Sequence, residues 1–450
     1  MLAQPLARPD WQASAGRRPA RAGGFHAGHG AFLLAHNGAN LLNYAYLLAM
    51  SRALAPDDFA LFASLFGAVY LASALANTAQ WSVAAAVAVD PAATDASVAS
   101  AVRRLTKLSL PFGLVVLVAA RPIASVLHSD DVLSVALSGA AIALSLFAAT
   151  GYGGLQGSDR FGLLGTGLVV AASGRLVLSA GFLLLGLGVR GALLGLVIGL
   201  ALSAALVLAP YARSVARAPS HGSAGPPLVA ALLASIAIAT PTSADVVFAR
   251  HYFAPDQAAA YAAVSVLGKV AVFGPMAVSL IFLPRFMSDA TQARRSLRLG
   301  LLLNAVIAVP LAAAVTAIAL LAPDLILRRY DVPPEVLLAY LGAMLAFSFV
   351  VMLLYYFIAR RATLFIYSTP LVLAGELAVA ACWHPSLLAV VSLLLAGNML
   401  LLAAGLLLAR ALAPVESSPT GRSQPIAIGG ALQDGDAQGL AERLGSERAV

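Results

Sequence analysis

The sequence has few charged side chains. Only 28 of its 450 residues are basic and 20 are acidic, so charged residues make up 11% of the chain, against about 25% in an average soluble domain. Because so little charge cannot cover a surface that faces water, the composition excludes a soluble globular enzyme. The apolar residues, 60% of the chain, suffice instead for many membrane spans of about 20 residues each. The composition therefore indicates a polytopic α-helical membrane protein.

Cysteine and lysine are nearly absent as well. The single cysteine, Cys382, lies inside an apolar run, which excludes an intramolecular disulfide and a cysteine metal cluster. Lys107 and Lys269 are the two lysines. The formal net charge of +8 comes from arginines clustered between apolar segments, which is typical of a membrane protein oriented by its loops. We therefore expect no nucleic acid, metal or cofactor.

Twelve apolar runs are long enough to cross a bilayer. They lie at roughly 31–50, 59–88, 108–127, 132–151, 161–184, 190–212, 228–248, 258–283, 299–322, 335–358, 363–383 and 386–409. The sequence therefore predicts an all-α polytopic fold of twelve transmembrane helices in two six-helix halves, 31–212 and 228–410, around a central cavity. We expect a basic cytoplasmic tail at 1–30, a cytoplasmic linker at 213–227 and a disordered cytoplasmic tail at 411–450.

The basic residues are distributed unequally between alternate connections. One side carries Arg8, Arg17, Arg18, Arg21, Arg103, Arg104, Lys107, Arg160, Arg213, Arg217, Arg285, Arg294, Arg295, Arg298, Arg360, Arg361 and Arg410, and the other carries Arg52, Arg121, Arg190, Arg250, Arg328 and Arg329. The positive-inside rule places the richer side in the cytoplasm. Both termini are therefore predicted to be cytoplasmic.

A nine-residue segment is repeated between the halves. Ala55–Ala63 opens the second span and Ala254–Ala262 opens the eighth, 199 residues later, with five of nine positions identical. The shared Pro and Asp are residues that favour the start of a helix, because Pro suits the first turn and Asp interacts with the positive end of the helix dipole. The repeat at equivalent places predicts two duplicated halves, an arrangement typical of transporters.

These and other segments resemble the polysaccharide-biosynthesis, or O-antigen-type, flippases of the multidrug/oligosaccharidyl-lipid/polysaccharide exporter superfamily. The resemblance covers nearly all of residues 31–410, and the order and spacing of its motifs carry it. The matching segments are Asn40–Tyr44, Ser51–Phe59, Gly153–Gly157 with Arg160 and Phe161, Ala244–Arg250 with Ala254–Asp256, Tyr261–Lys269 and Phe282–Arg285. The sequence departs from the family at Ala60 and Ala260, where glycine is common.

The resemblance implies a transporter that moves an isoprenoid-pyrophosphate-linked sugar from the cytoplasmic to the outer leaflet by alternating access. It also implies a bacterial inner-membrane protein whose partners are the lipid-linked glycan, membrane lipids and other polysaccharide assembly proteins. An exporter of drugs or organic cations from the same superfamily is the alternative. A membrane glycosyltransferase or polymerase is less favoured, because the outer connections are short and carry no catalytic constellation. We therefore expect no enzyme activity.

Four charged residues fall well inside predicted spans: Arg175, Asp245, Lys269 and Glu376. Such groups are costly in hydrocarbon and either line a wet cavity or pair with one another between helices. Both interpretations are open, and the first is favoured. Arg175 and Lys269 suit a pyrophosphate, Arg as a bidentate fork and Lys as a point charge. Because Tyr261, Ser265 and Lys269 recur every four residues, they share one helical side, with Asp245 as a hypothetical partner.

Uncharged polar residues form two further patches. His36, Asn40 and Asn43 lie on one face of the first span, with Asn37 and Tyr44 beside it, and Asn77 and Gln80 lie in the second. Amides suit sugar hydroxyls but also join helices to one another, and both interpretations remain open. Together with the four charged residues, His36, Asn40, Asn43, Asn77 and Gln80 make up the nine candidate cavity residues, and Asn37 and Tyr44 flank them.

A glycine-rich segment and several prolines within or near spans predict flexible positions in the chain. The segment Gly151–Gly157 lacks the Lys-Ser/Thr ending of a phosphate loop and is predicted to be a flexible cytoplasmic turn between the fourth and fifth spans. Prolines within or near spans free backbone groups and permit bending. They are Pro111, Pro241, Pro275, Pro310 and Pro370.

The unequal distribution of basic residues gives a testable topology. A reporter enzyme that is active only outside the cytoplasm should be silent when fused after Val450 and active when inserted beside Arg329. Both fusions should be produced at similar levels, measured by immunoblot. Strong reporter activity at Val450 would overturn the orientation.

Overall fold

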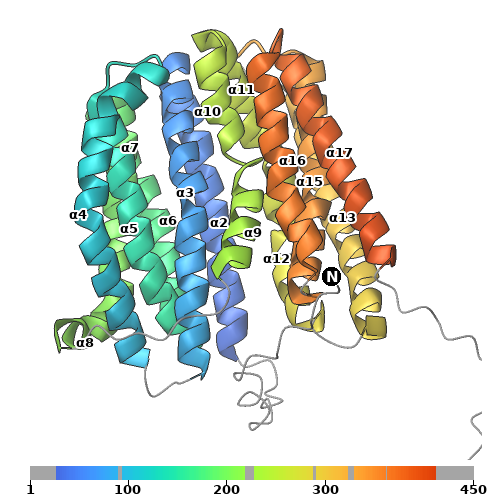
Figure 1. Cartoon of the computed structure of the whole chain (residues 1–450). Coiled ribbons are helices and arrows are strands. Elements are labelled where there is room, and N and C mark those ends of the chain that lie inside the picture. The colour runs from blue at the N-terminus through green and yellow to red at the C-terminus, as the bar shows by residue number, and fades with distance from the viewer. Residues whose placement is uncertain are drawn as a thin grey trace, which may run out of the picture. The chain divides into compact units, whose positions relative to one another are not determined.

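The computed structural model describes residues 27–89, 94–217, 228–286, 290–322, 329–360 and 362–411. Within these ranges the chain is helical and contains no strand (Figure 1). The tails predicted at 1–30 and 411–450, except for their edges at 27–30 and at 411, lie outside the described residues. So do Arg328 and Arg361.

Six long helices form the first half. They are α2 (Ala27–Ala53), α3 (Pro56–Val89), α4 (Thr94–Val126), α5 (Val132–Gly157), α6 (Phe161–Leu184) and α7 (Gly188–Leu208). The chain then continues through one 3₁₀ turn, η2 (Ala209–Tyr211), into the short helix α8 (Ala212–Arg217). The beginning of the predicted linker is therefore helical, and its remainder, 218–227, is not described.

The described residues of the second half form eight helices, because the seventh span is broken and the eighth is interrupted at Lys269. They are α9 (Leu228–Ala239), α10 (Ala244–Tyr252), α11 (Pro255–Gly268), α12 (Val270–Phe286), α13 (Ala290–Leu321), α15 (Pro334–Arg360), α16 (Thr363–Cys382) and α17 (Leu387–Ala411). If α9 with α10 and α11 with α12 each count as one span, the described residues contain the twelve spans predicted from the sequence.

Nine of these spans are long and apolar enough to be identified by length and composition alone. The other three are α2, α4 and the α9–α10 pair. Polar side chains such as Asn40 and Asn43 interrupt α2. The pair α9–α10 consists of two pieces that are each too short to span alone.

The helix starts predicted by the repeat are confirmed. Helix α3 begins at Pro56 with Asp57 and Asp58 in its first turn, and α11 begins at Pro255 with Asp256 in its first turn. The remaining residues of these segments face inward, since Phe59, Phe62 and Tyr261 are fully buried. The two segments thus begin equivalent helices in the two halves.

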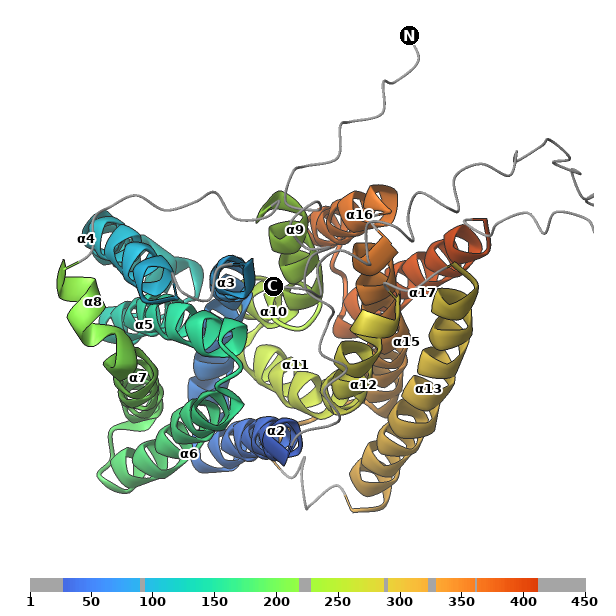
Figure 2. The same cartoon turned by 90° about the horizontal axis from the view of Figure 1, so that it is seen from below.

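Helices α2 and α3 carry most of the contact with the second half. Helix α3 packs against α9, α10 and α11, and α2 packs against α11, while α4–α7 contact mainly their own half (Figure 2). Helix α13 exposes a row of large apolar side chains, including Leu302 and Val306, as expected for a surface that faces lipid.

The seventh span is broken at its centre. Pro241 has no N–H to donate to the preceding turn, and the chain turns through Thr240–Ser243 before α10 begins. The exposed backbone groups find local partners: the Thr242 hydroxyl donates to the carbonyls of Ile238 and Ala239, and the Ala244 N–H donates to Thr240. Irregular backbone at this depth is tolerated because it is buried in protein or lines a cavity.

The glycine-rich segment Gly151–Gly157 is not a turn, so that prediction is wrong. It forms the last two turns of α5, and the chain turns only at Ser158 and Asp159. A Cβ atom on Gly153 would lie 2.5 Å from the carbonyl oxygen of Gln80 in α3. The glycines therefore allow close packing of α5 against its neighbours rather than flexibility.

The close approach of α3 and α5 predicts the effect of adding one methyl group. Gly153→Ala should lower the midpoint of thermal unfolding in detergent, because backbone atoms of α3 must move to admit the Cβ, at a cost of about 1–3 kcal/mol. Gly181→Ala is the matched control, since nothing lies within 4 Å of that position and alanine favours helix. Equal midpoints for the two variants would contradict this packing.

Candidate functional site

A cavity of about 100 Å³ lies between the two halves, which is smaller than the range of about 300–1,000 Å³ typical of small-molecule sites. The first half contributes side chains from α2, α3 and α6, and the second contributes the α9–α10 turn, α10, α11 and α12. The lining residues are Asn40, Asn43, Tyr44, Leu47, Ala63, Phe66, Gly67, Tyr70, Arg175, Thr242, Ser243, Val246, Ala262, Ser265, Val266, Lys269 and Phe273.

Two cationic side chains enter this cavity from opposite halves. Arg175 projects from the middle of α6, where its Nε atom donates to the carbonyl of Ala171 at 3.3 Å. Lys269 lies at the junction between α11 and α12, in the middle of the eighth span. No carboxylate is among the described side chains that line the cavity. The cavity wall is therefore positively charged.

Asp245 lies next to Lys269, in the first turn of α10, and is buried among hydroxyl groups. Its Oδ2 atom accepts hydrogen bonds from Tyr340 at 2.7 Å, from Tyr261 at 3.3 Å and from Ser265 at 3.4 Å. Its Oδ1 atom is 4.0 Å from the Lys269 ammonium, and only 7% of the Asp245 side chain is exposed. The ion pair that the sequence suggested as a hypothesis is therefore present.

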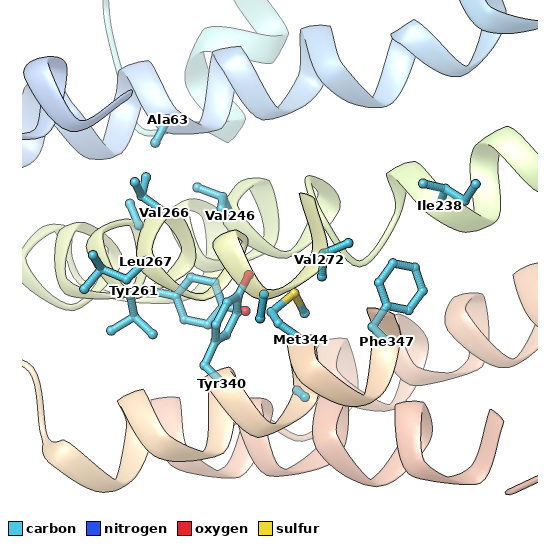
Figure 3. Packing of buried hydrophobic residues seen from close by; sticks show 14 of the residues in the cluster. Ala63, Ile238, Val246, Tyr261, Val266, Leu267, Val272, Tyr340, Met344 and Phe347 are labelled. Carbon is cyan, nitrogen blue, oxygen red and sulfur yellow. The ribbon is translucent and has the colours of Figure 1, made fainter. Parts of the chain in front are cut away.

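The carboxylate joins three helices of the second half. Tyr261 belongs to α11 and Tyr340 to α15, and their rings meet edge to face at 5.7 Å (Figure 3). Gly268 makes this arrangement possible, because a Cβ there would lie 2.3 Å from the Tyr340 ring. In the same view Ala63 of α3 faces Val246 and Val266 across the boundary between the halves (Figure 3). Small and branched apolar residues thus surround the polar cluster.

The structure brings together four of the nine candidate residues at the cavity wall and places a fifth behind it. Asn40, Asn43, Arg175 and Lys269 line the cavity, and Asp245 is the counter-ion of Lys269. The Oδ1 atom of Asn43 and the Oγ atom of Ser243 are buried without a hydrogen-bond partner in the described part of the chain. Both belong to the cavity lining and are available to a polar ligand.

The other four candidates lie elsewhere. His36 packs on Phe32 one turn from Asn40, with ring centroids 5.8 Å apart. Asn77 is exposed, and Gln80 donates from its amide to the side chain of Gln156 at 2.9 Å. Glu376 lies between α16 and α17 against Gly397. None of these side chains is part of the cavity lining.

Several cavity residues were not among the candidates. Phe66, Tyr70 and Phe273 resemble ordinary core aromatics in sequence, and no pattern separates them from the rest of their spans. Thr242 and Ser243 could have been found, because Pro241 marked the point at which the seventh span bends. Tyr340, which donates to Asp245, comes from a helix distant in sequence, so no local pattern reveals it.

The arrangement of two helical halves around a central cavity is similar to that of solved transporter structures, two of which are described as members of the MOP superfamily. No family model matches the sequence, and no curated protein matches it. Among solved structures, the inward-facing conformation of a multidrug resistance MATE family transporter has a TM-score of 0.61 and 16% identity. That match covers 82% of this chain and 93% of the other.

Two further solved structures are similar. The lipid II flippase MurJ, in an inward closed conformation, has a TM-score of 0.65 at 11% identity, with 84% of this chain and 87% of that chain covered. A MOP superfamily transporter from Pyrococcus furiosus has a TM-score of 0.50 at 17% identity, with 85% and 92% covered. These similarities establish the fold, and its cavity must be interpreted from its own residues.

The ion pair predicts a specific pattern of stabilities. Asp245→Ala should destabilise the protein because it leaves a charged lysine without its partner in the interior of the bundle. Adding Lys269→Met should restore part of the lost stability, with a coupling energy of about 0.5–3 kcal/mol in thermal or denaturant unfolding. Asp256→Ala, at an exposed carboxylate on α11, is the control. Strict additivity of the two cavity substitutions would contradict the pairing.

Proposed function

We propose that this protein is a flippase that moves an isoprenoid-pyrophosphate-linked oligosaccharide from the cytoplasmic to the outer leaflet of a bacterial inner membrane. The observation that carries the proposal is the charge of the cavity: Arg175 and Lys269 line it from opposite halves, and no carboxylate is among its described lining residues. A cavity of this kind attracts an anion and repels an organic cation.

The electrostatics favour a compact, multiply charged anion. Asp245 offsets the charge of Lys269, but its Oδ2 atom is occupied by hydroxyl donors and its Oδ1 atom is 4.0 Å from the ammonium. A pyrophosphate close to the cavity wall would approach Lys269 from the other side. Arg175 offers a planar guanidinium suited to two phosphate oxygens. The interaction is strong because the surroundings are apolar.

Polar groups around the cations suit the sugar. Asn43 and Ser243 each have an unpartnered oxygen at the cavity wall, and Asn40 lies one helical turn from Asn43. Amides and hydroxyls at these positions can exchange hydrogen bonds with sugar hydroxyls. The isoprenoid chain requires no polar site, because the lipid-facing surface is apolar.

The position of the site explains how transport would proceed. The cations belong to different halves, so the anion binds both only while the halves are close together around it. Rocking of one half against the other would then expose the site to one side of the membrane at a time. The ligand drives this equilibrium to the extent that its affinity differs between the two states. Other polysaccharide assembly proteins would supply and receive the lipid-linked glycan.

Export of a drug or organic cation is the second candidate. Tyr44, Phe66, Tyr70 and Phe273 line the cavity, and aromatic faces attract organic cations. A cationic substrate requires a negatively charged side chain, and the two candidates, Asp245 and Glu376, are not in the cavity lining. The anionic substrate is therefore favoured.

Loss of the protein should have a defined chemical phenotype. Cells that lack it should accumulate complete lipid-linked glycan in the inner leaflet and display less surface polysaccharide, measured by mass spectrometry of extracted lipids and by surface staining. Lipid-linked chains shortened by one sugar would instead indicate a transferase. Unchanged glycan with greater sensitivity to cationic dyes would indicate the drug exporter.

The role of Lys269 predicts a graded series of variants. Lys269→Ala should abolish export while the protein inserts at normal levels, and Lys269→Arg should keep part of the activity because the charge remains. Exchanging the charges, with Asp245→Lys and Lys269→Asp together, should restore folding better than transport, since the cation is displaced. Lys107→Ala, at the other and exposed lysine, is the control. Full export by Lys269→Ala at wild-type abundance would remove Lys269 from the site and leave Arg175 as the better candidate.

A further inference from the structure

The predicted outer ends of the two halves are joined by hydrogen bonds to helix C-termini. The last carbonyls of a helix have no partner within the helix, and the negative end of the helix dipole lies there. Basic side chains commonly satisfy such carbonyls. In this structure the basic side chains come from the opposite half of the molecule.

Two consecutive residues of α10 form hydrogen bonds with carbonyls at the C-terminus of α4. Arg250 donates from Nε to the carbonyl of Leu127 at 2.9 Å and from Nη2 to that of His128 at 3.5 Å, and it also pairs with Asp57 of α3. His251 shares a hydrogen bond of 2.8 Å between its Nδ1 atom and the carbonyl of Val126. Because a carbonyl can only accept, the His251 Nδ1 atom carries the proton.

The C-terminus of α2 is capped in the same way by the connection between α13 and α15. Arg329 donates from Nη1 to the carbonyls of Arg52 at 2.8 Å and Leu54 at 3.3 Å. Tyr330 donates its hydroxyl to the carbonyl of Ser51 at 2.6 Å. Arg250 and Tyr330 are both buried, so these contacts are shielded from competing water.

The two sets of contacts are related by the internal repeat. Adding the repeat distance of 199 to Ser51 and Arg52 gives Arg250 and His251. Each pair ends the first span of its half, and each pair contacts the connection between the third and fourth spans of the opposite half. Donor and acceptor roles are reversed, since the carbonyls belong to the first half in both cases. The interface is thus repeated by the fold and is not a single chance contact.

We infer that Arg250, His251, Arg329 and Tyr330, with the carbonyls of α2 and α4 that they cap, form an outer latch that holds the cavity closed on the outer side. Opening on that side must separate the halves and strip both helix ends of their caps. Arg250 contributes most, because one guanidinium satisfies two carbonyls and pairs with Asp57. These four residues therefore set the balance between the two access states.

The latch has a consequence for transport. A closed outer end favours loading of the cavity from the cytoplasmic side, and substrate binding must offset the loss of the caps before release. Weakening the latch should therefore raise the outer-open population without substrate. This inference rests on the proposed transport function for its biological role, but the conformational balance itself can be measured without any substrate.

Double electron–electron resonance can test the latch. Cys382 is exposed and is replaced first (Cys382→Ser), after which spin labels are placed at Leu185 and Gln257, two exposed positions at the outer end of opposite halves. Arg250→Ala should raise the ratio of long to short distances at least about tenfold, equivalent to roughly 1.4 kcal/mol. Arg329→Ala should act in the same direction, and Arg250→Lys should give a smaller change because it keeps the charge but not the fork.

The matched control is Arg190→Ala. Arg190 is also an arginine at the outer end, but its partner, Asp131, belongs to the same half, so its removal should leave the distances unchanged. If Arg250→Ala does not fold, the Arg250→Lys and Arg329→Ala distributions decide the outcome. Distances in all latch variants that match those of the parent would overturn the inference. A shifted balance without any glycan phenotype would leave the latch standing and refute the proposed substrate.

Discussion

A charged lysine in the middle of a membrane-spanning bundle is stable only while a counter-charge is held beside it. Lys269 has this position, and Asp245 holds it at 4.0 Å. The cost of burying the ammonium without its carboxylate is several kcal/mol in order of magnitude, so much of the local architecture serves the pair. Tyr261, Ser265 and Tyr340 fix the carboxylate, and Gly268 leaves room for the Tyr340 ring.

The interrupted spans also contribute to the cavity. Irregular backbone is tolerated at mid-membrane depth only where it is buried in protein or lines a cavity. The α9–α10 turn and the α11–α12 junction are such places, and they bring Thr242, Ser243 and Lys269 to the cavity wall. The first half has no equivalent break among its described spans, and its cation Arg175 projects from a continuous helix. The two halves therefore differ where they line the cavity.

The sequence predicted the parts of the fold that depend on local composition. Span positions, the starts of α3 and α11 and the all-helical class follow from apolar length and helix-start chemistry. The glycine-rich end of α5 was misjudged because glycine at a close helix contact and glycine at a turn look alike in one sequence. The difference lies in Gln80 and its neighbours on α3, far away along the chain.

The site was predictable only in part for the same reason. Arg175, Asp245 and Lys269 stand out because charge is rare in apolar segments, whereas Glu376 stands out equally and lies between α16 and α17, away from the cavity. Helical spacing places Asn40 and Asn43 on the face that also carries His36, but the cavity begins only at Asn40. Which polar residues face the cavity depends on how the halves pack, and this information is distributed over residues far apart in sequence, such as Ala63, Val246 and Val266, which lie opposite one another (Figure 3).

The central claim is that the cavity between the halves binds the anionic group of a lipid-linked substrate. The most direct measurement is the thermal unfolding of the purified protein with a short isoprenyl pyrophosphate, with the matching isoprenyl alcohol and with an organic cation. A ligand that binds the folded state raises the unfolding midpoint as its concentration exceeds its dissociation constant. The pyrophosphate should raise the midpoint, the alcohol and the cation should not, and the increase should disappear in Lys269→Ala. Stabilisation by the cation, with none by the pyrophosphate, would contradict the account.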